Sequence, residues 1–137
     1  TGMTRRAGDI LERQKSVTSS KMDVLTRMKE MCGDSLRVLQ SGRSLNRFGE
    51  ILHGGWLEKR TLVDTISNNS INEYYEKARE AGALGGKLLG AGGGGFLLFY
   101  VEKQNQDRVR DALPELKELP FLFEPQGSKV IYVSDDM

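Results

Sequence analysis

The chain has 137 residues, of which 38% are hydrophobic and 28% charged, as is ordinary for a globular protein. With 20 basic and 19 acidic residues its net charge is +1, and bases are mixed with acids, which does not favour nucleic-acid binding. The longest apolar run, residues 96–101, is too short to cross a bilayer. The single cysteine, Cys32, excludes an intrachain disulfide. We therefore expect a cytoplasmic protein that binds neither nucleic acid nor membrane.

Helical patterns begin near the start of the chain. Residues 5–14 are a short helix candidate, and a longer helix is expected to begin at Ser20, with Asp23 in a capping-box position, and to end at Gly42. Apolar residues recur along this second helix at spacings of three and four: Met22, Leu25, Met28, Cys32, Leu36 and Leu39. Such a stripe predicts one buried face, on which Cys32 is a small core residue.

Two further helices are expected before residue 82. The third begins at Ser44 and carries the apolar spacing Leu45, Phe48, Leu52 and Trp56. The fourth opens with a capping box formed by Ser70 and Glu73 and is followed by Gly82 as its C′ residue. Core packing is the default role for Trp56, and a structural role is favoured for the lone histidine, His53, because no partner acid is identifiable.

The pattern then changes to strands. Residues 83–89 and 96–101 predict two strands, the second of them buried, and a helix is expected from Asn105 to Leu113 with Val109, Ala112 and Leu113 facing inward. Residues 119–123 and 128–133 predict two more strands, with Pro120 at an entry or edge position. The expected fold is α+β: a four-helix N-terminal part followed by a β-β-α-β-β antiparallel sheet.

The segment between the first two strands is rich in glycine: Gly90, Ala91, Gly92, Gly93, Gly94 and Gly95. It matches G-x-G-x-x-G, but a dinucleotide site needs this loop to open a helix, and here it opens a strand. A P-loop is excluded because Leu88 follows Gly86-Lys87 where Ser or Thr is required, and a protein kinase would need H-R-D and D-F-G downstream. The remaining interpretations are a loop whose amides hold an anion or permit a close contact, and a tight hairpin without a ligand.

The stretch "KLLGAGGGGF" resembles the third motif of the GHMP kinases, the superfamily of galactokinase, homoserine kinase, mevalonate kinase and phosphomevalonate kinase. Within it, the chain is most similar to bacterial D-glycero-D-manno-heptose 7-phosphate kinases and related sugar kinases. The supporting stretches are "FGEILHGGWLEKRTLVDTISN", "INEYYEKAREAGALGGKLLGAGGGGFLLFYV" and "LPFLFEPQGSKVIYV".

This resemblance implies that residues 1–137 form one ferredoxin-like C-terminal domain whose glycine loop lies close to the transferred phosphate. ATP, Mg²⁺ and a sugar phosphate are the implied cofactors and substrate. In the family, an N-terminal domain in cis supplies the serine-rich phosphate loop, the Mg²⁺ carboxylate and, in most members, a catalytic aspartate. None of these is recognisable here, so no catalytic or metal-binding residue is expected in this chain, and we expect it to be inactive alone.

Three basic residues are candidate contacts for a substrate phosphate. Lys59 and Arg60 end the third helix, and Lys87 lies on the strand that enters the glycine loop. The alternative is that these charges are only solvated. The rival function is a free-standing ferredoxin-like module, either regulatory or binding a small anion through the glycine loop.

Overall fold

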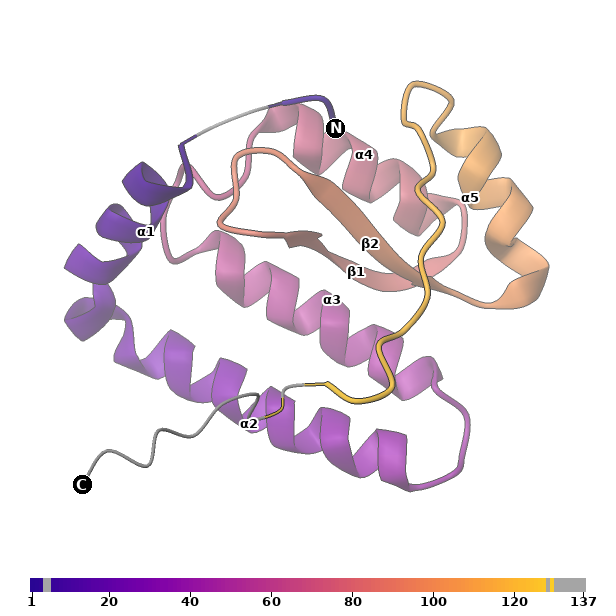
Figure 1. Ribbon diagram of the computed structural model, residues 1–137, viewed down its shortest axis with the longest axis horizontal. Helices are drawn as coiled ribbons and strands as arrows, with labels where there is room; N and C mark the ends of the chain where they lie inside the picture. Colours follow the sequence, from indigo (N-terminus) through magenta and orange to yellow (C-terminus); the bar gives the residue numbers. More distant parts are fainter. Residues whose placement is uncertain (4–5, 128, 130–137) are drawn as a thin grey trace.

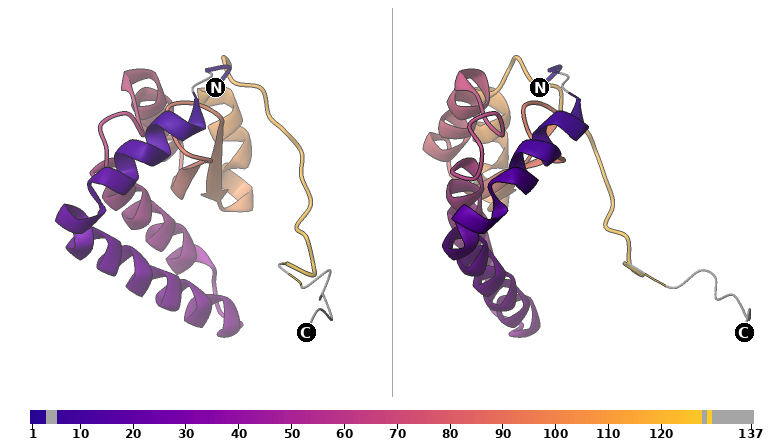
Figure 2. Two further views of the ribbon diagram at one scale, coloured as in Figure 1. Left: turned by 60° about the vertical axis from the view of Figure 1, so that its left-hand side comes forward. Right: turned by 90° about the vertical axis from the view of Figure 1, so that its left-hand side faces the viewer.

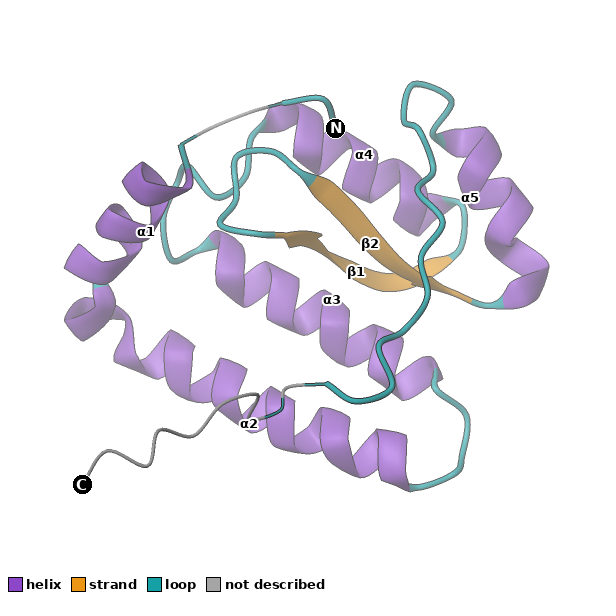
Figure 3. Ribbon diagram, viewed as in Figure 1, coloured by secondary structure: helices purple, strands orange, loops and turns teal. Residues whose placement is uncertain are grey.

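The structure is a computed structural model that describes residues 1–3, 6–127 and 129. Helices pack around one β-hairpin, with the hairpin loop at one end of the molecule and the last helix at the other (Figures 1 and 3). The elements, in chain order, are α1 (Ala7–Ser16), η1 (Thr18–Lys21), α2 (Met22–Gln40), α3 (Asn46–Arg60), α4 (Asn69–Glu80), β1 (Ala83–Leu89), β2 (Phe96–Val101), η2 (Lys103–Asn105) and α5 (Gln106–Ala112). Within the described residues, no helix is both long and apolar enough to span a membrane.

The sheet is smaller than the sequence predicts. β1 and β2 pair antiparallel, from Ala83 opposite Val101 to Leu89 opposite Phe96, and the described part of the chain contains no further strand. The α+β class is confirmed, whereas the β-β-α-β-β sheet is wrong for this structure. β2 is also only partly buried, with Phe96 55% exposed.

Residues 119–123, predicted as a strand, are irregular and run away from the body of the molecule (Figure 2). Leu122 is 95% exposed and Phe123 88% exposed, so the apolar pattern here has no sheet to pair with or pack on. Pro120 also removes one backbone donor, which makes a strand less favourable. The last predicted strand, residues 128–133, lies outside the described residues apart from Lys129.

The glycines predicted the C-terminal ends of the helices better than the capping boxes predicted their starts. Gly42 and Gly82 follow α2 and α4 with φ angles of +65° and +114°, as predicted for C′ glycines. α4 begins earlier than the Ser70 capping box predicts, because the side chain of Asn68 accepts a hydrogen bond from the Ile71 amide at 3.0 Å. Ser20 lies inside η1 and does not cap α2.

Two glycines allow α3 to cross β1 at very close range. A Cβ atom on Gly85 would lie 1.8 Å from the carbonyl oxygen of Gly49 and 2.8 Å from the amide nitrogen of His53. A Cβ atom on Gly49 would lie 2.7 Å from a ring carbon of Tyr100 and 2.8 Å from Cβ of Leu84. Any side chain at either glycine would therefore push the helix away from the sheet.

The core is divided between the two ends of the hairpin. Near the glycine loop, the buried residues are Ile10, Val24, Trp56, Leu62, Val63, Ile66, Ile71, Tyr75 and Leu88. Near α5, they are Ala78, Ala83, Val109 and Leu113. The predicted burial of Trp56, Val109 and Leu113 is confirmed.

The predicted apolar stripe of α2 is mostly exposed. Leu25 and Met28 pack against the core, but Cys32 is exposed and Leu36 is 55% exposed. The prediction that Cys32 is a core residue is therefore wrong. α2 packs along α3, so a single neighbouring helix covers only a narrow part of its surface.

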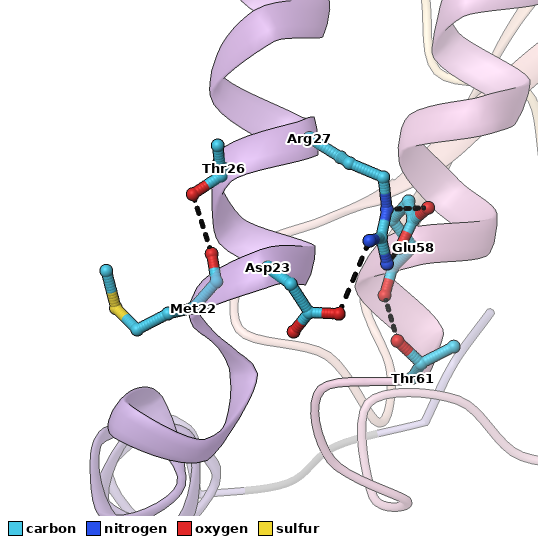
Figure 4. A network of polar contacts seen from close by, with 6 residues as sticks. All are labelled: Met22, Asp23, Thr26, Arg27, Glu58 and Thr61. Atoms are coloured by element: carbon cyan, nitrogen blue, oxygen red, sulfur yellow. Dashed lines mark hydrogen bonds and ion pairs between the residues drawn. The ribbon is translucent and has the colours of Figure 1, made fainter.

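An ion-pair network joins α2 to α3 (Figure 4). Arg27 donates to both carboxylate oxygens of Glu58, at 2.7 and 2.9 Å, and to Asp23 at 3.3 Å. The hydrogen bond from Arg27 lowers the pKa of the Glu58 carboxyl. The bidentate geometry fixes how the two helices lie along each other next to Lys59.

Candidate functional site

The glycine loop closes the β1–β2 hairpin, as predicted. Four of its residues adopt positive φ angles: Gly90 at +95°, Gly92 at +123°, Gly93 at +71° and Gly95 at +108°. Side chains other than hydrogen are strained in this region of backbone space, so the loop shape itself requires glycine.

One side of the loop packs against the rest of the chain. The Gly93 amide donates to the carbonyl of Ile66 at 2.8 Å, and a Cβ on Gly92 would lie 2.8 Å from Cα of Ile66. The hydroxyl of Thr1 donates to the Gly95 carbonyl at 2.9 Å and accepts from its amide at 3.1 Å. Part of the glycine requirement is thus explained by contacts within this chain.

The Gly90 end of the loop is exposed, whereas Gly92 is buried. Among the described residues, the amides of Gly90, Ala91, Gly92 and Gly94 have no hydrogen-bond partner. A Cβ on Gly90 would meet nothing within 4 Å. Neighbouring amide donors in glycine-rich turns form concave sites for anions, so the exposed end of the loop suits a phosphate group.

Two of the three predicted basic residues meet at this loop. The ammonium group of Lys59 donates to the Gly90 carbonyl at 3.2 Å. Burial, together with the nearby charge of Lys87, lowers the pKa of Lys59. Within the described residues, no carboxylate forms an ion pair with either lysine. The loop therefore has an uncompensated positive charge beside its open amides.

The structure places Arg60 elsewhere. Its guanidinium donates to Oδ1 of Asn72 at 3.2 Å and lies 5.9 Å from the ring centroid of Trp56. It lines an open depression of about 660 Å³, together with Met3, Asp64, Ser67, Asn68, Asn69, Ser70 and Asn72. In the sequence, the signal for this depression is the polar run from Ser67 to Asn72. Its pattern predicts a helix start and does not reveal the depression.

His53 belongs to the packing of α3 and α4. Its Nδ1 atom lies 2.9 Å from the hydroxyl of Tyr75, and the two rings stack at 5.8 Å. Burial raises the pKa of Tyr75 to about 12, so the phenol stays protonated. Burial and the charge of Arg79 lower the pKa of His53, which favours the neutral ring. This geometry agrees with a structural role for His53.

Comparison with protein families identifies the type of domain. The family model "GHMP kinases C terminal" matches residues 35–118, more than half of the chain and all of the hairpin. The chain belongs to this family. It is therefore a GHMP kinase C-terminal domain, and the resemblance based on the glycine motif is confirmed.

Two individual kinases are similar to the chain at moderate sequence identity. The chain is 29% identical over 115 residues to a D-glycero-alpha-D-manno-heptose 7-phosphate kinase of Campylobacter jejuni, covering 82% of this chain and 34% of the relative. It is 33% identical over 108 residues to a mevalonate kinase of Thermococcus onnurineus, covering 77% of this chain and 26% of the relative. The chain thus spans about a third or less of these two relatives.

A solved structure supports the fold. The chain superposes on L. major mevalonate kinase, crystallised in complex with R-mevalonate, with a TM-score of 0.71 at 19% identity. The match covers 83% of this chain and 36% of that enzyme. At this identity the likeness shows the shared fold and does not identify a substrate.

Proposed function

We propose that this GHMP kinase domain forms one wall of the active site of an ATP-dependent sugar kinase of the heptose 7-phosphate type, acting in the cytoplasm. The observation that supports this proposal best is the glycine loop, where open backbone amides lie beside Lys59 and Lys87 without a nearby carboxylate. Phosphoryl transfer depends mainly on positioning and on neutralising phosphate charge, and this is what the loop can supply.

In this proposal the open amides of the loop donate to the phosphoryl group that ATP transfers. Gly90, which is exposed, and Ala91 contribute amides without a partner among the described residues, and the bare backbone at Gly90 lets the phosphate approach closely. Lys59 and Lys87 contact the phosphate of the acceptor sugar. Arg60, the third candidate, would reach the acceptor from the depression beyond Ile66.

The residues of this chain do not fit a Mg²⁺ site. Among the described residues, no three His, Cys, Asp or Glu side chains gather in a way that could hold a metal ion. We propose that a preceding N-terminal domain supplies the metal carboxylate, the serine-rich phosphate loop and the catalytic group.

The lysine pair supports a phosphorylated acceptor. A dianionic phosphate on the sugar would be stabilised by two ammonium groups that form no ion pair with a carboxylate among the described residues. The Campylobacter relative is named for such an acceptor, a heptose 7-phosphate, whereas the Thermococcus relative is named for mevalonate. A heptose phosphate is therefore the acceptor we propose.

The test compares the 137-residue chain with the same chain joined to its upstream coding sequence. We expect ATP-dependent phosphorylation of heptose 7-phosphate by the longer protein and none by the chain alone. Turnover by the isolated chain would contradict the proposal. Submillimolar binding of ATP or sugar phosphate by the isolated chain would instead support the rival, a self-contained anion-binding module.

A further inference from the structure

The depression around Arg60 has a different chemistry from the lysine pair. Seven of its eight lining residues are polar: one guanidinium, one carboxylate, two serine hydroxyls and three carboxamides, with Met3 as the exception. Asp64 pairs with Arg13 at 2.9 Å, and the guanidinium of Arg60 donates to Asn72. Such a lining offers many donors and acceptors, as a polyhydroxylated ligand requires.

Internal hydrogen bonds orient this lining. Oδ1 of Asn72 accepts from Arg60 at 3.2 Å and from the Ser67 hydroxyl at 2.8 Å. These two contacts fix the carboxamide, so that its Nδ2 group is left with no protein partner among the described residues. Because Trp56 packs under the guanidinium, Arg60 is also held in place.

The depression adjoins the glycine loop through two direct links. Ile66, whose carbonyl accepts from Gly93 at 2.8 Å, immediately precedes the lining residue Ser67. Met3 lines the depression, and its carbonyl oxygen would lie 2.2 Å from a Cβ on Gly94. A ligand in the depression would therefore lie beside Gly93 and Gly94, on the side of the loop that packs against the rest of the chain.

We propose that this depression binds hydroxyl groups of the acceptor sugar, with Asn72 as a specificity-determining residue. The inference rests on the proposed kinase function, and it specifies where the uncharged, hydroxyl-bearing part of the sugar binds. Lys59 and Arg60 are adjacent in sequence, yet they serve two subsites because consecutive helical side chains point about 100° apart.

The variant Asn72→Asp tests this role with little disturbance of the fold. Aspartate keeps an oxygen that accepts from Arg60 and Ser67, but it replaces the Nδ2 donor with a second acceptor. In the full-length enzyme we expect the KM for the sugar to rise about 10-fold, the scale of one lost hydrogen bond with an unsatisfied partner, while the KM for ATP stays unchanged. Asn105→Asp, at the opposite end of the hairpin, is the matched control. An unchanged sugar KM in Asn72→Asp would overturn the proposal.

A binding measurement separates this inference from the kinase activity. With ¹⁵N-asparagine label in the full-length protein, we expect millimolar D-mannose to shift the side-chain amide signals of Asn68 and Asn72 but not that of Asn105. Inorganic phosphate should leave all three unchanged. A shift caused by phosphate, or none caused by mannose, would overturn the sugar subsite. Absence of phosphorylation by the full-length protein would instead refute the proposed function.

Discussion

Two regions of this domain use glycine for different physical reasons. At the α3–β1 crossing, neither Gly49 nor Gly85 has a positive φ angle. Glycine is required there because a side chain would have no room: a Cβ on Gly85 would lie 1.8 Å from a carbonyl oxygen. In the hairpin loop, Gly90 to Gly95 include four positive φ angles and one side with open amides. The first set holds the fold together, and the second shapes the surface at which we propose that an anion binds.

The largest effect is expected from a charge placed in the loop. Gly93→Asp puts a carboxylate next to the proposed phosphate position, and we expect turnover of the full-length enzyme to fall by at least about 1,000-fold, since electrostatic groups at such sites have effects of this size. We expect the domain to remain folded, although Gly93 is buried and its positive φ angle adds a strain of about 1–2 kcal/mol. Steady-state kinetics and circular dichroism measure the two effects, and a normal turnover number would refute the role of the loop.

At the crossing, the expected loss is in stability. Gly85→Ala forces a methyl group against the Gly49 carbonyl, and we expect the free energy of unfolding to fall by about 3 kcal/mol or more. Urea denaturation measures this change. Gly90→Ala is the matched control, because a methyl group there meets nothing within 4 Å, although its positive φ still costs about 1–2 kcal/mol. Equal losses in the two variants would remove the distinction between the two regions.

The sequence predicted the features that depend on local signals. The C′ glycines Gly42 and Gly82 and the glycine hairpin each follow from a residue's own backbone preference. Periodicity also identified α2 as an amphipathic helix, but it could not say which part of the stripe finds a neighbour, so Cys32 was wrongly assigned to the core. The prediction of a third strand at residues 119–123 is wrong because an apolar pattern does not guarantee that a neighbouring strand is there to pair with it.

The candidate site was predictable only in part. The loop and Lys87 are adjacent along the chain, and Lys59 joins them because α3 ends beside Gly90. The separation of Arg60 from Lys59 follows from helix geometry and was available from the sequence. The role of Asn72 depends on a tertiary contact between α3 and α4, which no local pattern reveals.

An intermediate effect is expected from the two lysines. Lys59→Met and Lys87→Met should each raise the KM for a phosphorylated sugar about 10- to 100-fold, because a charge-assisted hydrogen bond is lost, while the KM for the same sugar without its phosphate changes little. Lys59→Arg keeps the charge and a donor for the Gly90 carbonyl, and it should retain more affinity than the Met variant. Equal effects on both sugars would show that the lysines only support the loop.

The smallest effect is expected on the pH dependence of stability, through His53 at the α3–β1 crossing. His53 has a pKa below the ordinary value of 6.5 because of burial and Arg79, so the unfolded chain binds more protons once the pH drops below about 7. Stability should therefore decrease as the pH falls from about 7 toward the lower folded-state pKa. His53→Gln should flatten this dependence in urea titrations at several pH values. If the stability of the wild-type protein instead increased as the pH fell over this range, the predicted direction of the pH dependence would be wrong.

The central claim is that the open loop amides bind a phosphate group, and amide NMR of the ¹⁵N-glycine-labelled full-length protein tests it most directly. On addition of a non-hydrolysable ATP analogue with Mg²⁺, we predict large shifts for Gly90 and Gly94, whose amides have no hydrogen-bond partner among the described residues, and small ones for Gly49 and Gly85 at the crossing. Unchanged signals for the loop glycines under saturating analogue would contradict the account.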